Sequence, residues 1–340
     1  MIPKDITYNL LHEFDKTPTL SILFFEIFII LGTIIILFLL SRIKDKIPQR
    51  YFLVAAGVLI FEIFTAPMWN NFKLGWWAYV YRDVSWILTV GWSTMILTAV
   101  ILVDKFFSKY IEWQRFIVYL LLITVAVFIA ESSVVGLGIR AYSPEVLDTL
   151  VGYFIINVPI EALYYIPVFT SLVIAFYKYW SFSLDDKAIV PVKNRAWLRN
   201  LALAFIGVFF FELMVEPMVV NAKFPSWSYM YRDISILMSG VWIIIIWLAT
   251  GLVDRIFIQL DIAKRFALYL IVGTTVFLPL ESWFIASGLR IYGPSAVENF
   301  VGINTPITHT PVEVALAIPF YLALIICFIR YWEIILDNKR

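Results

Sequence analysis

Two stretches of the sequence, FEIFTAPMWNNFKLGWWAYVYRDVS at 61–85 and FELMVEPMVVNAKFPSWSYMYRDIS at 211–235, align without a gap at a shift of 150 positions. Twelve of the 25 aligned positions are identical, whereas unrelated stretches would match at about one or two. The same shift aligns 131–152 with 281–302, at 8 identical positions of 22. After a two-residue insertion, PIEALYYIP (159–167) aligns with PVEVALAIP (311–319). The chain is therefore a tandem duplication.

The duplicated segments lie among long apolar runs. Of the 340 residues, 62% are hydrophobic and 15% charged, against about 45–50% and about 25% in soluble domains. A helix that crosses a bilayer needs about 20 apolar residues. The runs are continuous rather than alternating, which favours helices over a β-barrel. Nine runs qualify, at 20–41, 51–70, 84–103, 116–138, 156–179, 200–220, 234–252, 266–288 and 310–330.

The repeats and the runs together predict the organisation of the chain. We expect an all-α, polytopic membrane helix bundle with about nine transmembrane helices. It consists of an extra N-terminal helix (1–50), a four-helix repeat A (51–180), a polar linker (181–199) and a four-helix repeat B (200–340). Because four is an even number, both repeats enter the membrane in the same direction and are expected to be parallel.

The distribution of Lys and Arg predicts the orientation. Alternate connections carry 18 of the 26 Lys and Arg residues, and the opposite side carries 8. Positive residues concentrate on the cytoplasmic side of membrane proteins. We therefore expect an integral membrane protein with its N-terminus outside and its C-terminus in the cytoplasm, in a bacterial or archaeal plasma membrane.

Several classes of function are excluded or disfavoured by composition. The net charge of +1 provides no basic field for nucleic acid. One cysteine, Cys327, and two histidines, His12 and His309, are too few for a thiolate or multi-histidine metal site. No nucleotide-binding loop or hydrolase elbow occurs. We expect no metal, no cofactor and no nucleic-acid partner.

Carboxylates at membrane depth are the first candidate functional residues, since a charged group there costs about 2.5–3.5 kcal/mol on insertion scales. Six of them occur in matched positions of the two repeats: Glu62, Glu131, Glu161, Glu212, Glu281 and Glu313. Glu62 and Glu212 could donate a proton or stabilise a cation. They could equally form structural ion pairs with an arginine.

The loop that follows Glu62 supplies the second group of candidates, as walls of a substrate pocket. They are Trp77, Tyr79, Tyr81, Arg82, Asp83 and Arg140, with Trp227, Tyr229, Tyr231, Arg232, Asp233 and Arg290 in repeat B. Aromatic faces can stabilise a carbocation. The alternative is an interfacial aromatic belt, with Asp83 paired to Arg82 and capping the helix predicted to begin near Val84.

Spacing makes further predictions for the remaining carboxylates. Glu131 and Arg140 would lie about 13 Å apart along a continuous helix, so we expect each to find another partner. The segment T-P-V-E, ending at Glu313, is typical of a helix N-terminus with a capping box. Position 158 holds Val in repeat A, so the box is broken there although Glu161 remains.

The P-x-E-A-L-Y-Y segment within 152–165, repeated as P-x-E at 311–313, resembles the helix start of the lycopene cyclase domain. The stretch from Glu62 through W-x-Y-x-Y at 77–81 resembles membrane carotenoid hydratases, and the E…D pattern in the same place resembles the small membrane terpene cyclases of meroterpenoid pathways. The resemblance implies an isoprenoid substrate. It also implies that Glu161 and Glu313, with Glu62 and Glu212, are acids or cation-stabilising groups.

The leading hypothesis is thus an integral membrane enzyme that cyclises, isomerises or hydrates a lipophilic carotenoid or terpenoid by carboxylate acid–base chemistry. Its partners would be that substrate and membrane lipids, and its oligomeric state is left open. The alternatives are a proton- or cation-coupled transporter, a sterol- or lipid-binding membrane protein, and a structural membrane subunit. The enzyme hypothesis predicts that the duplicated carboxyl groups converge on an apolar hollow.

Overall fold

The computed structural model describes residues 16–186 and 197–337. The chain divides into two compact units, unit 1 up to Asp185 and unit 2 from Asp186 onward. This boundary lies within the linker predicted from the sequence, most of which (187–196) lies outside the described residues.

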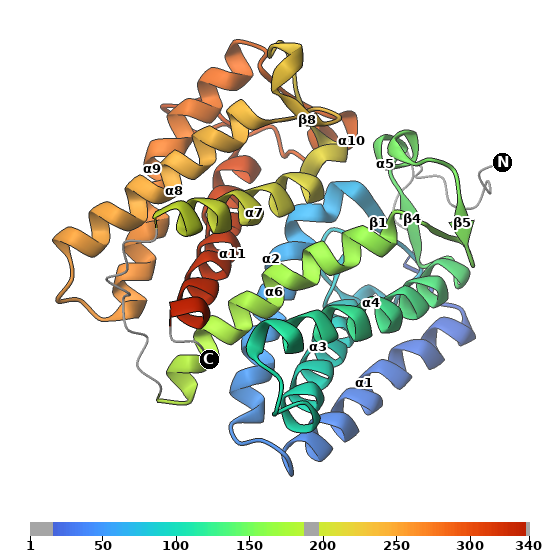
Figure 1. The fold of residues 1–340 in the computed structure, drawn as a ribbon. Helices are drawn as coiled ribbons and strands as arrows, with labels where there is room; N and C mark the ends of the chain where they lie inside the picture. Colours follow the sequence, from blue (N-terminus) through green and yellow to red (C-terminus); the bar gives the residue numbers. More distant parts are fainter. Residues whose placement is uncertain (1–15, 187–196, 338–340) are drawn as a thin grey trace. The chain divides into compact units, whose positions relative to one another are not determined.

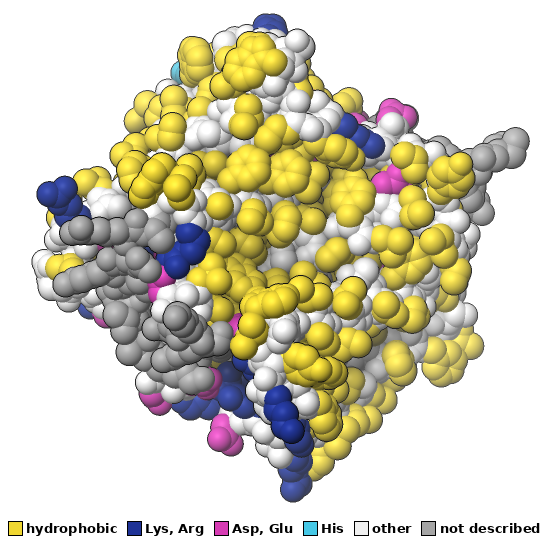
Figure 2. Space-filling model, in the orientation of Figure 1, with side chains coloured by type: hydrophobic (Ala, Val, Ile, Leu, Met, Phe, Trp, Pro, Cys, Tyr) yellow, Lys and Arg dark blue, Asp and Glu magenta, His cyan; other side chains and the backbone are white. Residues whose placement is uncertain are grey.

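Within 16–186 and 197–337, nine helices are long and apolar enough to cross a membrane, so the prediction of an all-α membrane bundle with nine spans is confirmed. The long helices are α1 (Leu20–Leu40), α2 (Ile47–Thr65), α3 (Trp86–Phe106), α4 (Glu112–Gly136), α6 (Ala162–Leu184), α7 (Trp197–Val215), α8 (Ile236–Ile256), α9 (Ile262–Ala286) and α11 (Val312–Asp337). Large apolar side chains remain exposed on them, such as Phe24, Phe28, Leu121 and Val125. Figure 2 shows yellow hydrophobic side chains over much of the visible surface, as expected of helices that face lipid.

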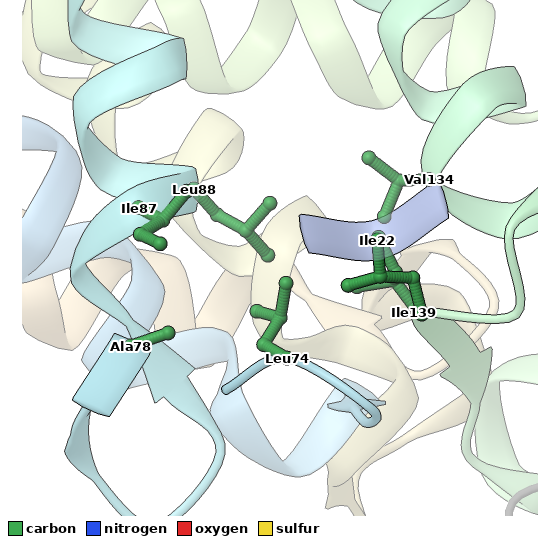
Figure 3. Close-up of a cluster of buried hydrophobic side chains, with 7 residues drawn as sticks. All are labelled: Ile22, Leu74, Ala78, Ile87, Leu88, Val134 and Ile139. Carbon is green, nitrogen blue, oxygen red and sulfur yellow. The ribbon is translucent and has the colours of Figure 1, made fainter. Parts of the chain in front are cut away.

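Unit 1 is a closed ring of four helices with a fifth helix beside it. Helix α2 packs on α3, α3 on α4, α4 on α6, and α6 back on α2. Helix α1 has no equivalent in unit 2 and packs chiefly against α3 (Figure 1). Figure 3 shows the buried cluster that fixes α1, in which its Ile22 meets side chains of α3, α4 and two loops: Leu74, Ala78, Ile87, Leu88, Val134 and Ile139.

Unit 2 repeats the same ring. Helix α7 packs on α8, α8 on α9, α9 on α11, and α11 back on α7. The buried faces are aromatic: Phe211 stacks on Tyr321 with ring centroids 4.3 Å apart, and Trp242 stacks on Phe277 at 3.4 Å. Equivalent helices of the two units therefore have equivalent neighbours.

Short strands, which the sequence did not predict, join the helix ends within each unit. Strand β1 (Trp69–Asn71) pairs antiparallel with β4 (Arg140–Tyr142), and β7 (Val219–Asn221) pairs in the same way with β10 (Arg290–Tyr292). The other short elements are η2 (Ala66–Met68), η3 (Trp76–Ala78), β2 (Tyr79–Tyr81), β3 (Val84–Ser85), α5 (Pro144–Thr149), β5 (Phe154–Ile155), β6 (Val158–Pro159), η4 (Glu216–Met218), η5 (Ser226–Ser228), β8 (Tyr229–Tyr231), β9 (Ile234–Ser235) and α10 (Pro294–Glu298).

A glycine reverses the chain between α4 and β4. Gly138 has φ +68°, its N–H donates to the Val135 carbonyl at 2.9 Å, and the Ile139 N–H donates to the Val134 carbonyl at 3.0 Å. This is the Schellman arrangement, which favours glycine at the left-handed position. Gly288 has φ +66° in unit 2 and makes the matching bonds. The helix that begins at Glu112 therefore does not continue to Arg140.

Candidate functional site

Each unit contains a cluster of buried polar side chains where the long helices meet the short strands. The cluster of unit 1, called the first polar centre, consists of Glu62, Asn71, Asp83, Thr89, Glu131, Arg140 and Tyr142. All seven residues are at least nine-tenths buried. Such a cluster is stable in an apolar interior only if its members bond to one another.

Arg140 is at the middle of the first polar centre. Its Nη1 lies 2.9 Å from Glu131 Oε2, and its Nε donates to Asn71 Oδ1 at 3.0 Å. The guanidinium also lies 4.8 Å from the ring centroid of Trp69. The prediction that Glu131 and Arg140 do not pair is wrong, because the glycine turn and the β1–β4 register bring Arg140 back beside the helix end.

Glu62 has no ion pair with an arginine among the described residues. Its Oε2 hydrogen-bonds with the Thr89 hydroxyl, which also lies 3.0 Å from the Ser85 carbonyl oxygen. Its Oε1 is buried and has no hydrogen-bond partner among residues 16–186 and 197–337. Of the two roles left open for Glu62, a direct ion pair with arginine is not formed in the described part of the chain.

Asp83 ties the loop to the strand rather than capping a helix. Its Oδ2 accepts from the Asn71 N–H at 3.2 Å, and its carbonyl accepts from the Asn71 side-chain amide at 3.0 Å. Helix α3 begins at Trp86 with Ser85 as its N-cap residue, so the prediction that Asp83 caps this helix is wrong. Burial raises the pKa of the Asp83 carboxyl to about 7.

The raised pKa of Asp83 predicts a pH-dependent stability. The folded protein keeps this proton up to about pH 7, whereas an unfolded aspartate loses it near pH ~3.9. The contribution to stability is therefore full below pH ~4 and declines as the pH rises toward 7, by at most about 1.4 kcal/mol per pH unit. We expect Asp83→Asn to remove this decline when thermal midpoints in detergent are compared between pH 4 and 8. Curves for the two proteins that stay parallel would contradict the assignment.

The second polar centre, in unit 2, holds the residues that align with the first: Glu212, Asn221, Asp233, Ser239, Glu281, Arg290 and Tyr292. Five of them are buried, and Asp233 and Tyr292 are half-buried. Arg290 Nε lies 3.3 Å from Glu281 Oε2, and Tyr292 donates to Glu281. The Ser239 hydroxyl bonds with Glu212 Oε2 and lies 3.2 Å from the Ser235 carbonyl oxygen. The arrangement of a paired and an unpaired carboxyl group is thus repeated.

The two centres differ in how completely they are bonded. Arg290 Nη2 and Asn221 Oδ1 are buried without a hydrogen-bond partner in the described residues, and Arg290 Nε and Glu281 Oε2 make only the ion-pair contact with each other. The matching atoms of Arg140, Asn71 and Glu131 in unit 1 are not among the buried atoms that have no hydrogen-bond partner. Val219 stands where unit 1 has Trp69, so the face of Arg290 lacks that indole. Buried polar atoms without partners cost about 1–3 kcal/mol each, which marks the second centre as a place that takes in water or a polar group.

Two further predicted carboxylates serve as loop anchors. Glu161 Oε1 accepts from the Val151 N–H at 2.6 Å, and Glu313 Oε1 accepts from the Val301 N–H at 2.5 Å. The predicted capping box at Glu313 is wrong, since the Thr310 N–H donates to Thr305 at 3.0 Å instead. Neither carboxylate belongs to a polar centre, so four of the six predicted carboxyl groups come together, two in each unit.

The predicted aromatic pocket walls lie in the loops. Trp77 and Trp227 are exposed. The Tyr79 hydroxyl donates to the Asn71 carbonyl at 3.1 Å, and Tyr229 does the same to Asn221 at 3.0 Å. Arg82 and Arg232 each lie against the neighbouring ring, Tyr81 and Tyr231, at 5.7 and 5.4 Å. The two tyrosine hydroxyls and the two arginines thus make contacts within the loops.

A second duplicated set of charged residues was missed in the sequence. In unit 1, Asp104 contacts Arg115 at 3.1 Å and Lys178 at 2.7 Å, and Tyr119 donates to it. Unit 2 repeats the set with Asp254, Arg265, Tyr269 and Arg330. The shift of 150 that aligns R-F-x-x-Y-L at 115–120 with 265–270 would have found it. Both ends of each bundle are therefore polar, not the outer end alone.

Comparison with known proteins adds no relative, because no family model, no curated protein and no solved structure matches the chain.

Proposed function

We propose that this membrane protein is an enzyme that protonates a carbon–carbon double bond of a lipophilic isoprenoid, leading to cyclisation, isomerisation or hydration. The candidate acids are Glu62 and Glu212. Both lie in the bundle interior, and the second oxygen of each is buried without a partner among the described residues. A substrate that dissolves in lipid can reach such a group only from within the membrane.

The observation that carries the proposal is the hydroxyl beside each acid. Thr89 Oγ1 contacts both Glu62 Oε2 and the Ser85 carbonyl, but a hydroxyl has one proton to donate. If that proton goes to Ser85, the Glu62 carboxyl supplies the proton of the other bond. Ser239 makes the same two contacts with Glu212 and Ser235. This geometry supports a neutral carboxylic acid, which is the form that can protonate an alkene.

The proposed reaction is balanced within the site. The carboxyl proton adds to one alkene carbon, the π-electron pair forms the new C–H bond, and a carbocation and a carboxylate remain. Loss of a proton from the cyclised or rearranged cation to the carboxylate restores the acid. In the hydration variant, water adds to the cation and its proton returns to the carboxylate. Helix rings such as Phe61 and Phe169, stacked 3.6 Å apart, could face the cation.

Unit 2 is the better candidate for the reacting unit. Its centre has Arg290 Nη2 and Asn221 Oδ1 buried without partners in the described chain. Tyr321 also replaces the Phe169 of unit 1 and interacts electrostatically with Glu212 and Arg290. These groups would suit an isoprenoid with an oxygen function, such as a prenyl quinone.

The function is tested by expressing the chain in cells that accumulate an acyclic carotenoid or a prenyl quinone. We expect a new cyclised, isomerised or hydrated product in lipid extracts examined by liquid chromatography and mass spectrometry. Cells with the empty vector provide the control. Unchanged extracts for both substrate classes, with the protein present in the membrane, would contradict the proposal.

Coupled transport is the second candidate, because polar clusters occur at both ends of the four-helix bundles. The Asp104 and Asp254 clusters provide charged groups at the second end of each bundle, which a proton pathway across the membrane needs. An enzyme that faces lipid does not need them. Proton uptake by vesicles that contain the purified protein, without product formation, would favour this candidate.

For the orientation, we propose an outside N-terminus and a cytoplasmic C-terminus in a bacterial or archaeal plasma membrane, from the excess of Lys and Arg. Reporter fusions at each terminus check it.

A further inference from the structure

A partly open polar cavity of about 130 Å³ lies in unit 2, at the opposite end of the bundle from the second polar centre. It lies among α7, α8 and α11 and has room for several water molecules. Its polar lining consists of Asn200, Thr250, Asp254, Arg330 and Glu333. None of these residues takes part in the isoprenoid chemistry proposed above.

At three of the lining positions, unit 2 has a smaller side chain than unit 1. Asn200, Gly251 and Ile329 align with Arg50, Ile101 and Tyr177. In unit 1 these larger groups fill the space, where the buried Arg50 interacts with Tyr177 and with Asp185. Unit 1 thus holds a guanidinium group where unit 2 has a void.

The lining of the cavity holds one carboxylate more than the matched positions of unit 1. Asp254, Arg330 and Glu333 give the cavity two carboxylates and one guanidinium. Arg265 also lies 3.4 Å from Asp254 and balances its charge, and the aligned positions in unit 1 hold Asp104, Lys178 and Ser181. Glu333 is therefore the lining carboxylate at which an added cation is favoured.

Glu333 provides a free acceptor. It is nine-tenths buried, and only its Oε2 is engaged, by Arg330 Nη1 at 2.9 Å. Its Oε1 makes no hydrogen bond within residues 16–186 and 197–337. Asp254, by contrast, is occupied by Tyr269, Arg265 and Arg330. A carboxylate oxygen that lines a cavity together with an amide (Asn200) and a hydroxyl (Thr250) is suited to a primary ammonium group, which has three donors.

We propose that this cavity binds a primary ammonium group, supplied either by a small soluble amine or by the headgroup of an amino lipid. The ammonium occupies the space that the Arg50 side chain takes in unit 1 and donates to Glu333. The apolar wall of the cavity, which includes Trp247, Ile326 and Ile329, accommodates the carbon chain of the amine.

The test compares ethanolamine with ethylene glycol, a neutral molecule of nearly the same shape, by calorimetric titration of the purified full-length protein in detergent. We expect ethanolamine to bind at least 10-fold more tightly than the glycol. Nanodiscs of phosphatidylethanolamine, compared with nanodiscs of phosphatidylcholine, distinguish the sources: if the lipid headgroup is the ligand, added ethanolamine binds only in phosphatidylcholine. Ethanolamine that binds no better than the glycol in detergent and in phosphatidylcholine overturns the proposal.

Two matched variants in helix α8 test whether the amine binds in this cavity. Gly251→Ile introduces the residue of unit 1, and a Cβ added there meets no atom within 4 Å. We expect it to fold and to weaken ethanolamine binding at least 10-fold, as does Glu333→Gln. Gly240→Val also introduces the unit 1 residue into open space, away from the cavity, and should leave binding unchanged. Equal binding by the Gly251→Ile and Gly240→Val proteins would place the ligand elsewhere and overturn the assignment.

Discussion

Replacing Glu62 and Glu212 together by glutamine is expected to reduce product formation at least about 100-fold, the lower range for loss of a general acid. Glutamine keeps the shape of the side chain, and its amide can still donate to Thr89 or Ser239. The variant therefore removes the transferable proton while the hydrogen bond is kept. The measurement is product per amount of membrane-inserted protein in cells that make the acyclic substrate.

The single variants assign the reaction to a unit. We expect Glu212→Gln alone to cause most of the loss, because the second polar centre has the unpartnered groups around Arg290. Asp261→Asn is the control for expression, since Asp261 is an N-cap residue of α9 at which asparagine serves as well. If the double variant makes product at the rate of this control, neither glutamate is the acid.

Arg140→Gln is expected to lower the free energy of unfolding by about 3–5 kcal/mol, the usual cost of removing one partner of a buried ion pair. The Arg140 side chain is 4% exposed and bonds to Glu131 and Asn71, so the variant leaves a carboxylate buried without a cation. The measurement is an unfolding titration with denaturing detergent in mixed micelles, followed by circular dichroism or tryptophan fluorescence.

Two comparisons show whether the ion pair causes the loss. Arg290→Gln should be milder, because Arg290 contacts Glu281 alone of the matched partners and already has unpartnered N–H groups. Adding Glu131→Gln to Arg140→Gln should restore part of the stability, because no uncompensated charge remains. A double variant that is less stable than Arg140→Gln would show that the pair itself is not responsible.

The candidate site could be predicted in part. Duplication singled out Glu62 and Glu212, and the rise of a helix gave a correct separation for Glu131 and Arg140 only as long as the helix continued. Gly138 was the signal that it does not, since a glycine after a helical run is typical of the turn that ends one. The Asp104 cluster was missed because its residues lie on three different helices and only the repeat shift connects them.

The role of each carboxylate depended on contacts that the local sequence does not encode. Glu161 and Glu313 have the same local motif that resembles a cyclase helix start, yet both accept from a backbone N–H of the preceding loop, 10 and 12 residues earlier. Which oxygen of a buried carboxyl remains free depends on the neighbouring helix.

The sequence alone determined that the protein has nine apolar spans and two copies of a four-helix unit. Both can be read along the chain, because the length of an apolar run and the identity between two segments do not depend on how the chain packs. Only the tertiary structure decided which charges meet, which unit has unpartnered polar atoms and where unit 2 has a cavity. Those features depend on strand register, on the closing of each helix ring and on the volumes of side chains more than a hundred positions apart. Such residues become neighbours only when the chain packs in three dimensions.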